Sequence, residues 1–483
     1  MNLPPAPNGP AAWTLDDALA EHHLAMPDAL AAVCGDGAWS WAGLDDRVGA
    51  LAAGLAGLGA GPGDRILWLG QNCHRLLELL LASGRLGAAC CPANWRQSPE
   101  ELAFVIDDLE PRVVVWQEAE IGERVGKARA LSAAAGAAQW VQHDDDGGRP
   151  GSYEALLPSR ALVAQATAAM VLGLAGPDDV YLNCGPLFHV GTFKATLATF
   201  VAGGTNVFTP RVDADELCRL IDRHRCTGAF LQPPTMEAMA AANGDGRYDL
   251  SSLRARPGPP AWNAMVVVDD RPLPKSGYGQ TELAGVVTYR DPARPGQGGA
   301  GRPGPLARVE VMDADGRIVP PGGVGEIVVR GPMVMTGYHR RPELTARRQR
   351  GGWHHTGDLG RREADGSLTF VGPMTRLIKS AAENVYPAEV EGCLRAHPGV
   401  ADAAVIGVPD PTWGQAVVAV VVAADPAAPP AEADLIAHCR QRIASYKKPR
   451  RVEFRAGLPR RHGAVDYDAL DATYGGGGYP GAG

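Results

Sequence analysis

The segment Asp64-Arg-Ile-Leu-Trp-Leu69 has the length and apolar content of a buried strand, and residues 73–86 after it carry apolar side chains at helical spacing. The same alternation runs through residues 13–107, continues in Val113-Val-Val-Trp116, and returns between residues 178 and 290. Strands that alternate with helices are typical of βα units around a mostly parallel sheet. We therefore predict an α/β fold for this part of the chain.

The pattern changes after residue 305. Strand patterns at residues 308–312 and 326–330 flank turn-forming segments, which predicts a β-rich antiparallel portion over about 306–338. Beyond residue 371 the pattern predicts a small α+β unit, with helices near 387–397 and 431–445. We expect a large N-terminal domain of mixed sheets flanked by helices (1–372). A small, mobile C-terminal domain (373–483) with a mobile glycine-rich tail follows it.

Composition excludes several classes of protein. The 483 residues include 46 Lys and Arg against 54 Asp and Glu, a net charge of −8 without a dominant basic block, which argues against a nucleic-acid-binding protein. The nine cysteines form no C-x-x-C pair, and the first Lys or Arg is Arg47. The longest apolar run, residues 416–424, is too short to span a bilayer. These features predict a cytoplasmic protein without a transmembrane segment, and they do not indicate its oligomeric state.

A glycine-rich stretch at Gly54, Gly57, Gly59 and Gly61 superficially resembles a dinucleotide-binding loop. It follows a helix pattern and precedes a strand, whereas the phosphate-binding fingerprint follows a strand and opens a helix. We interpret it as the end of a helix, which argues against an NAD-dependent oxidoreductase.

A basic cluster lies near the C-terminus. Residues 440–461 contain nine basic side chains and one acidic one, Glu453. The cluster is either a solvated helix face or a binding surface for a phosphate-bearing ligand. The sequence leaves both interpretations open.

Three short motifs carry side chains that could take part in binding or catalysis. In Gly277-Tyr-Gly-Gln-Thr-Glu282, backbone N–H groups freed by glycine and the Thr281 hydroxyl can face a phosphate, and Glu282 can hold a hard cation. The alternative is an ordinary turn that Thr281 caps. In Trp353-His-His-Thr-Gly-Asp358, the carboxylate can bind a ribose diol or its own backbone. His189, in Gly185-Pro-Leu-Phe-His189, would by itself be read as a packed core side chain.

The order and spacing of these motifs are more specific than any one of them. Together with segments 325–331, 383–391 and 444–450, they resemble the adenylate-forming superfamily of acyl-CoA synthetases, adenylation domains and luciferases. The similarity extends from about Thr14 to Leu470 and is closest to the acyl-CoA synthetase branch. It implies an acid–thiol ligase acting on a small carboxylic acid, such as a fatty or aromatic acid, with ATP/AMP, Mg2+ and coenzyme A. The carboxylate attacks the α-phosphate of ATP to give acyl-AMP and pyrophosphate, and the CoA thiol then displaces AMP.

The resemblance also implies roles for individual residues. Thr281 contacts the phosphate, Glu282 the magnesium ion and Asp358 the ribose. Tyr278 lies beside the adenine, and His189 gates the carboxylate pocket. The remaining expected residues are Gly279 and Gln280 at the nucleotide, Arg376 at the hinge, and Ala381, Ala382, Lys447 and Lys448 at CoA.

The chain departs from the family pattern at several places. A Ser/Thr/Gly-rich phosphate loop is missing before the helix that begins near Ala161, and Ala464 replaces a lysine that bridges carboxylate and phosphate. At the hinge, Arg376 stands where the family has an acid and Pro373 where it has an arginine, and Ala381-Ala382 replaces Gly-Gly. Lys379 is our leading substitute for the lost lysine, with Arg376, Arg460 and Arg461 as others. The alternative function is a non-adenylating relative that binds nucleotide or an acyl ligand without full ligase activity.

Overall fold

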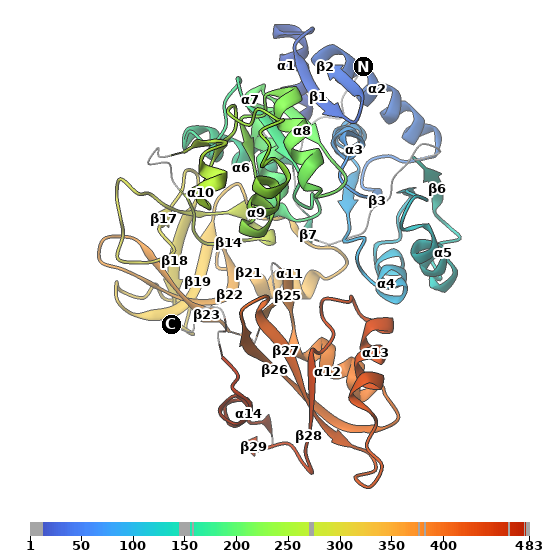
Figure 1. The fold of residues 1–483 in the computed structure, drawn as a ribbon, viewed down its shortest axis with the longest axis vertical. Coiled ribbons are helices and arrows are strands. Elements are labelled where there is room, and N and C mark those ends of the chain that lie inside the picture. Colours follow the sequence, from blue (N-terminus) through green and yellow to red (C-terminus); the bar gives the residue numbers. More distant parts are fainter. Residues whose placement is uncertain are drawn as a thin grey trace.

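The computed structural model describes residues 13–143, 155–156, 159–269, 275–374, 377–380, 383–461, 464–477 and 479. Two α/β regions and an antiparallel sheet form the N-terminal part, and a smaller α+β unit follows from residue 378 (Figure 1). The predicted fold class is therefore confirmed. Among the described residues, we find no helix with the length and hydropathy needed to cross a membrane.

The first sheet is built from the segment with which the sequence analysis began. Its strand order is β4 (Ala89–Pro92), β3 (Arg65–Leu69), β5 (Val113–Trp116), β6 (Gln139–Gln142), and all neighbours are parallel. The connections run through α3 (His74–Leu86), α4 (Pro99–Leu109) and α5 (Gly122–Leu131). Leu67 and Leu69 are fully buried among apolar residues of α4 and α5. A parallel sheet covered by helices explains why these strands are apolar along their whole length.

The second sheet has the order β10 (Gly228–Ala229), β8 (Val180–Asn183), β9 (Thr205–Phe208), β1 (Leu30–Cys34), β2 (Gly37–Ser40). Its helices are α1 (Leu15–Ala25), α2 (Trp41–Gly57), α6 (Ser159–Val171), α7 (Val190–Ala202) and α8 (Ala214–His224). Ser40 caps α2 by accepting a hydrogen bond from the Gly43 amide at 3.2 Å, so Trp41 belongs to the helix and not to the strand. The glycine-rich stretch does end this helix, with Gly59 at φ +82°.

The third sheet is antiparallel and extends beyond the predicted range of 306–338. It comprises β18 (Arg308–Met312), β19 (Val324–Arg330), β22 (Trp353–Arg362) and β23 (Leu368–Pro373), with the short β21 (Gln349–Arg350) on β22. In its register Asp358 lies opposite Pro373, and the Met374 amide donates to the Gly357 carbonyl at 2.8 Å. The chain thus leaves the N-terminal sheets directly beside Asp358.

The C-terminal unit has the strand order β25 (Glu383–Val385), β24 (Ile378–Ser380), β27 (Gly414–Ala423), β26 (Val400–Asp410), and β28 (Arg451–Phe454) is parallel to β27. Helices α12 (Pro387–Arg395) and α13 (Glu432–Arg442) pack on one core, and α14 (Tyr467–Tyr474) on another.

The described residues of the glycine-rich tail lie against β26 and β27. The Gly477 amide donates to the Gly407 carbonyl at 2.9 Å, and the Gln415 side chain donates to the Gly477 carbonyl at 2.6 Å.

Candidate active site

The predicted nucleotide residues Tyr278, Gln280 and Asp358 lie together where two short strands meet β22. The Tyr278 hydroxyl donates to Asp358 Oδ2 at 2.6 Å, and Gln280 Nε2 donates to the Tyr278 oxygen at 3.2 Å. Gly279 lies on β14 (Gly279–Gln280), which pairs with β15 (Gly285–Val286). A Cβ at Gly279 would come within 2.2 Å of the Gly285 carbonyl oxygen, so only glycine fits this close approach. These hydrogen bonds hold the Asp358 carboxylate in place beside Tyr278 and Gln280.

The protonation of this cluster is controlled by burial. Burial raises the pKa of Asp358 above its usual value, although the hydrogen bond from Tyr278 opposes that shift. Burial and the neighbouring Asp358 charge both raise the pKa of Tyr278, which therefore stays a donor. Further hydrogen-bond donors, such as the two hydroxyls of a ribose, would stabilise the charged form of this half-buried carboxylate.

Glu282 and Thr281 lie on a short 3-10 turn (η1, Thr281–Leu283) next to this cluster. Thr281 is exposed, and Glu282 Oε1 accepts a hydrogen bond from the Tyr338 hydroxyl at 2.8 Å. No group of three His, Cys, Asp or Glu side chains within the described ranges could hold a metal ion by itself. One carboxylate fits magnesium, because this ion is usually bound by one or two carboxylates together with substrate phosphates.

The chain before α6 is where the sequence analysis found a phosphate loop missing. The described residues there form β7 (Ala155–Leu156), which pairs antiparallel with β20 (Gly337–Tyr338) and contacts the turn that carries Glu282. Residues 144–154 and 157–158 lie outside the described part of the chain. The described strand thus approaches the proposed phosphate end of the site.

His189 is the N-cap residue of α7, and a residue of the C-terminal unit contacts it. Its Nε2 lies 3.4 Å from the carboxylate of Glu383, which also pairs with Arg96 Nη1 at 3.3 Å. Burial favours the neutral form of Glu383, but the His189 hydrogen bond and the nearby charges of His189, Arg96 and Lys379 bring its pKa below the usual value. Glu383 follows Ala381 and Ala382, which lie outside the described residues, as does the predicted hinge residue Arg376.

Lys447, predicted to contact CoA, is instead held between two carboxylates. Its Nζ lies 2.7 Å from Glu101 Oε1 in the N-terminal part and 2.5 Å from Glu389 Oε1. The residue is only 5% exposed. It is therefore closed to a ligand in this arrangement of the chain.

Three of the four side chains considered as substitutes for the missing lysine, Lys379, Arg460 and Arg461, contact residues of their own unit. Lys379 Nζ donates to Asn384 Oδ1 at 2.6 Å, Arg460 pairs with Asp402 at 2.8 Å, and Arg461 pairs with Asp466 at 3.0 Å. Arg461 and Ala464 lie on the hairpin of β29 (Arg460–Arg461) and β30 (Ala464–Val465). Figure 1 shows this hairpin at the end of the C-terminal unit away from the N-terminal sheets.

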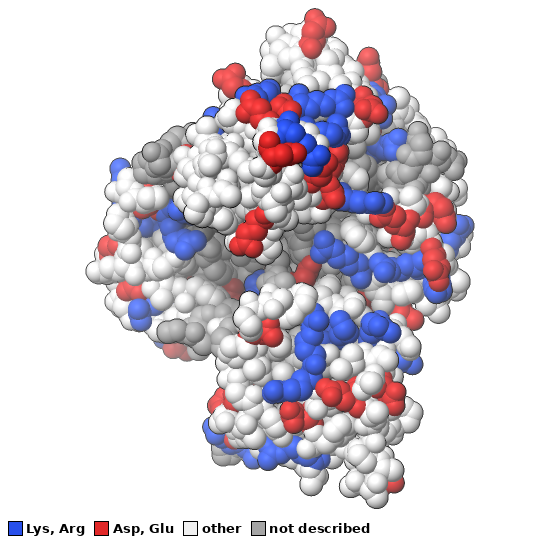
Figure 2. Space-filling model, in the orientation of Figure 1, with Lys and Arg blue, Asp and Glu red and all other residues white. Residues whose placement is uncertain are grey.

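Part of the basic cluster at residues 440–461 lies around Lys448. Burial and the neighbouring charges of Arg450 and Arg440 lower the pKa of Lys448. The Arg450 guanidinium stacks 4.0 Å over the Trp413 ring. Figure 2 shows Lys and Arg side chains gathered on the C-terminal unit next to the N-terminal part. Cations beside an aromatic ring suit a ligand that carries both phosphate and a base.

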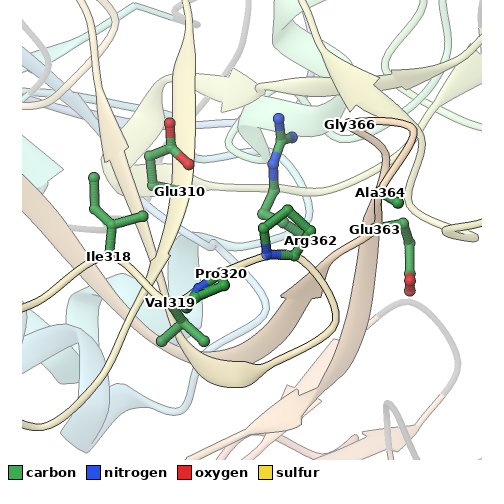
Figure 3. Close-up of a pocket in the computed structure, with 9 residues that line it drawn as sticks. Glu310, Ile318, Val319, Pro320, Arg362, Glu363, Ala364 and Gly366 are labelled. Carbon is green, nitrogen blue, oxygen red and sulfur yellow. The ribbon is translucent and has the colours of Figure 1, made fainter.

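A cavity of about 270 Å³ lies beside the third sheet (Figure 3). Glu310, Ile318 and Arg362 line it together with two turns. None of the predicted site residues contributes, so we assign it no ligand.

The large N-terminal part with its antiparallel sheet and the smaller C-terminal unit are matched by two family profiles. The profile of the AMP-binding enzyme family matches residues 19–150 and 155–339. That of the AMP-binding enzyme C-terminal domain matches residues 389–463. The chain belongs to the AMP-binding enzyme family, near the acyl-CoA synthetases of the adenylate-forming superfamily, as the motifs predicted.

Individual relatives agree with this assignment. The chain is 36% identical to feruloyl-CoA synthase of Amycolatopsis sp over 460 residues, which cover 90% of this chain and 93% of the relative. It is 32% identical to indoleacetate–CoA ligase of Aromatoleum aromaticum over 473 residues, which cover 87% of this chain and 90% of the relative. Amide bond synthetase McbA from Marinactinospora thermotolerans superposes with a TM-score of 0.78 at 28% identity, over 96% of this chain and 100% of that one. The predicted class, acid–thiol ligases with ATP, magnesium and CoA, is thereby confirmed.

Proposed function

We propose that the chain joins an aromatic or arylalkanoic acid to coenzyme A. The acid and ATP give acyl-AMP and pyrophosphate, and the CoA thiol then displaces AMP to give the thioester. The observation that carries the proposal is the Asp358–Tyr278–Gln280 cluster, a carboxylate with shared donors next to an exposed threonine. The acid class follows from the feruloyl-CoA synthase and indoleacetate–CoA ligase relatives.

In this proposal the residues near Asp358 bind and orient the nucleotide. Asp358 accepts hydrogen bonds from the ribose hydroxyls, Thr281 donates to the α-phosphate, and Glu282 holds magnesium against the phosphates. Tyr278 and Gln280 keep the Asp358 carboxylate in place. Preorganised groups of this kind stabilise charge where it develops between carboxylate and phosphate.

The second half-reaction uses the boundary between the two units. CoA binds with its phosphates on Lys448, Arg450 and Arg440 and with its base near Trp413, in place of the predicted contact with Lys447. His189 and Glu383 lie where the thiol arm would approach the acyl group. We place the enzyme in the cytoplasm, because its nine cysteines are all free.

The test is the release of pyrophosphate and AMP with ferulic, indoleacetic, 2-succinylbenzoic and long-chain fatty acids in the presence of ATP, magnesium and CoA. Release of both products with an aromatic acid and with CoA supports the proposal. AMP binding without release of either product supports the alternative, a non-adenylating relative. That alternative is favoured by one observation, the pairing of Arg460 and Arg461 with acids of their own unit around Ala464.

A further inference from the structure

The start of α4 and the end of α13 meet across the boundary between the two units. The Ser98 hydroxyl accepts the Glu101 amide hydrogen at 3.2 Å, which caps α4, and donates to the Arg442 carbonyl oxygen at 3.0 Å. That carbonyl is one of the last in α13, which have no partner inside the helix. The positive end of one helix dipole therefore faces the negative end of the other.

A buried charge reinforces this contact. Lys447 Nζ bonds Glu101 at 2.7 Å, and the same carboxylate accepts the Ser98 amide at 2.8 Å. Burial disfavours the charged form of Lys447, but Glu101 and Glu389 outweigh it and raise its pKa, so the ammonium stays charged. One hydroxyl, one carboxylate and one ammonium thus link the two units.

This link exists only while the C-terminal unit has its present orientation. In that orientation Glu383 reaches His189, and the hairpin that carries Ala464 is directed away from the nucleotide residues (Figure 1). We propose that Ser98, Glu101 and Lys447 are positioning residues for thiol transfer, an inference that rests on the proposed function. They hold the C-terminal unit in the orientation that the thiol step needs, and adenylation does not require them.

Glu101→Gln is the informative variant. Glutamine can still accept the Ser98 amide in a capping box, so α4 keeps its start, and Lys447 keeps Glu389 as its counter-charge. The matched control is Glu100→Gln, which removes the same charge from an exposed neighbour in the same helical turn. Glu389→Gln removes the partner within the C-terminal unit and leaves the link across the boundary intact.

Two measurements test the proposal. Thioester formation from synthetic feruloyl-adenylate and CoA should fall at least tenfold in Glu101→Gln, while pyrophosphate release with ferulic acid and ATP without CoA should change less than twofold. Hydrogen exchange of peptides spanning residues 97–103 and 441–448 should accelerate in Glu101→Gln. Glu100→Gln should match the parent in every assay, and Glu389→Gln should affect thiol transfer less than Glu101→Gln does.

Equal loss in both half-reactions, or unchanged thiol transfer and exchange in Glu101→Gln, would overturn the proposal. The same holds if Glu100→Gln reproduces the effect. If the parent forms no thioester from feruloyl-adenylate, the proposed acid class fails, and the exchange measurement alone decides whether Glu101 links the two units.

Discussion

Replacing Asp358 by asparagine removes one negative charge and leaves an oxygen that can accept the hydrogen bond from the Tyr278 hydroxyl. The side chain is half-buried, so the proposed contact with a ribose hydroxyl would be a charge-assisted hydrogen bond with limited screening. Such bonds contribute about 1.5–3 kcal/mol. We therefore expect the affinity for AMP to fall roughly tenfold to a hundredfold in Asp358→Asn.

Comparing Asp358→Ala with Asp358→Asn separates the effect on binding from the effect on folding. Asp358→Ala leaves the Tyr278 hydroxyl, in a side chain only 7% exposed, without its acceptor. An unsatisfied buried donor costs about 1–3 kcal/mol, so this variant should lose stability to urea as well as affinity. Asp358→Asn should unfold near the midpoint of the parent.

Titration calorimetry with AMP and urea unfolding of the three proteins measure both quantities. Equal AMP affinity in parent, Asp358→Asn and Asp358→Ala would remove Asp358 from the nucleotide site. A loss of affinity in Asp358→Ala alone would mean that the carboxylate acts only by holding Tyr278.

Three further predictions concern other charges. Ala464→Lys should raise the rate of pyrophosphate release with a matching acid by about tenfold, or about 1.4 kcal/mol, without changing the rate of thiol transfer from the adenylate. No change in either rate would show that another group neutralises the negative charge that develops during adenylation. Burial and Arg256 lower the pKa of Lys194 to about 8. At a pH between this value and the higher pKa of Lys194 in the unfolded chain, unfolding takes up a proton. The parent should therefore gain stability to urea relative to Lys194→Met as the pH rises from 7 to 9.5. A stability difference between the two proteins that does not change with pH would contradict this. Lys448→Ala should raise KM for CoA about fivefold, the effect of roughly 1 kcal/mol for a partly exposed charge, whereas the exposed control Lys127→Ala should not. An unchanged KM in Lys448→Ala would move CoA elsewhere.

Most secondary structure could be predicted from the sequence, because hydrophobic periodicity and capping are local. The helix predicted over residues 73–86 is α3 (His74–Leu86), and the strand Val113–Trp116 lies at the predicted residues. The β-rich portion was predicted too short, since β22 carries polar side chains and its burial comes from neighbouring strands.

The contacts between the two units could not be predicted in the same way. Glu101 and Lys447 are 346 residues apart, and their pairing depends on how the two units are oriented. The motif around Lys447 marked a position of interest without indicating which group it faces. By contrast, Tyr278 and Asp358 were assigned to one site because the motif order linked them.

The pairing of Asp358 with Pro373 bears on how the two halves of this molecule can be separated for study. A truncation that stops at residue 372, the boundary suggested by the sequence, removes the residue opposite Asp358 in the sheet and also the Met374 amide that bonds Gly357. The remaining fragment would have a frayed strand end beside its nucleotide residues, and weak AMP binding by it would be misread as a requirement for the missing domain. A fragment extended through Met374 keeps this edge of the sheet intact and is the proper reference for the contribution of the C-terminal domain.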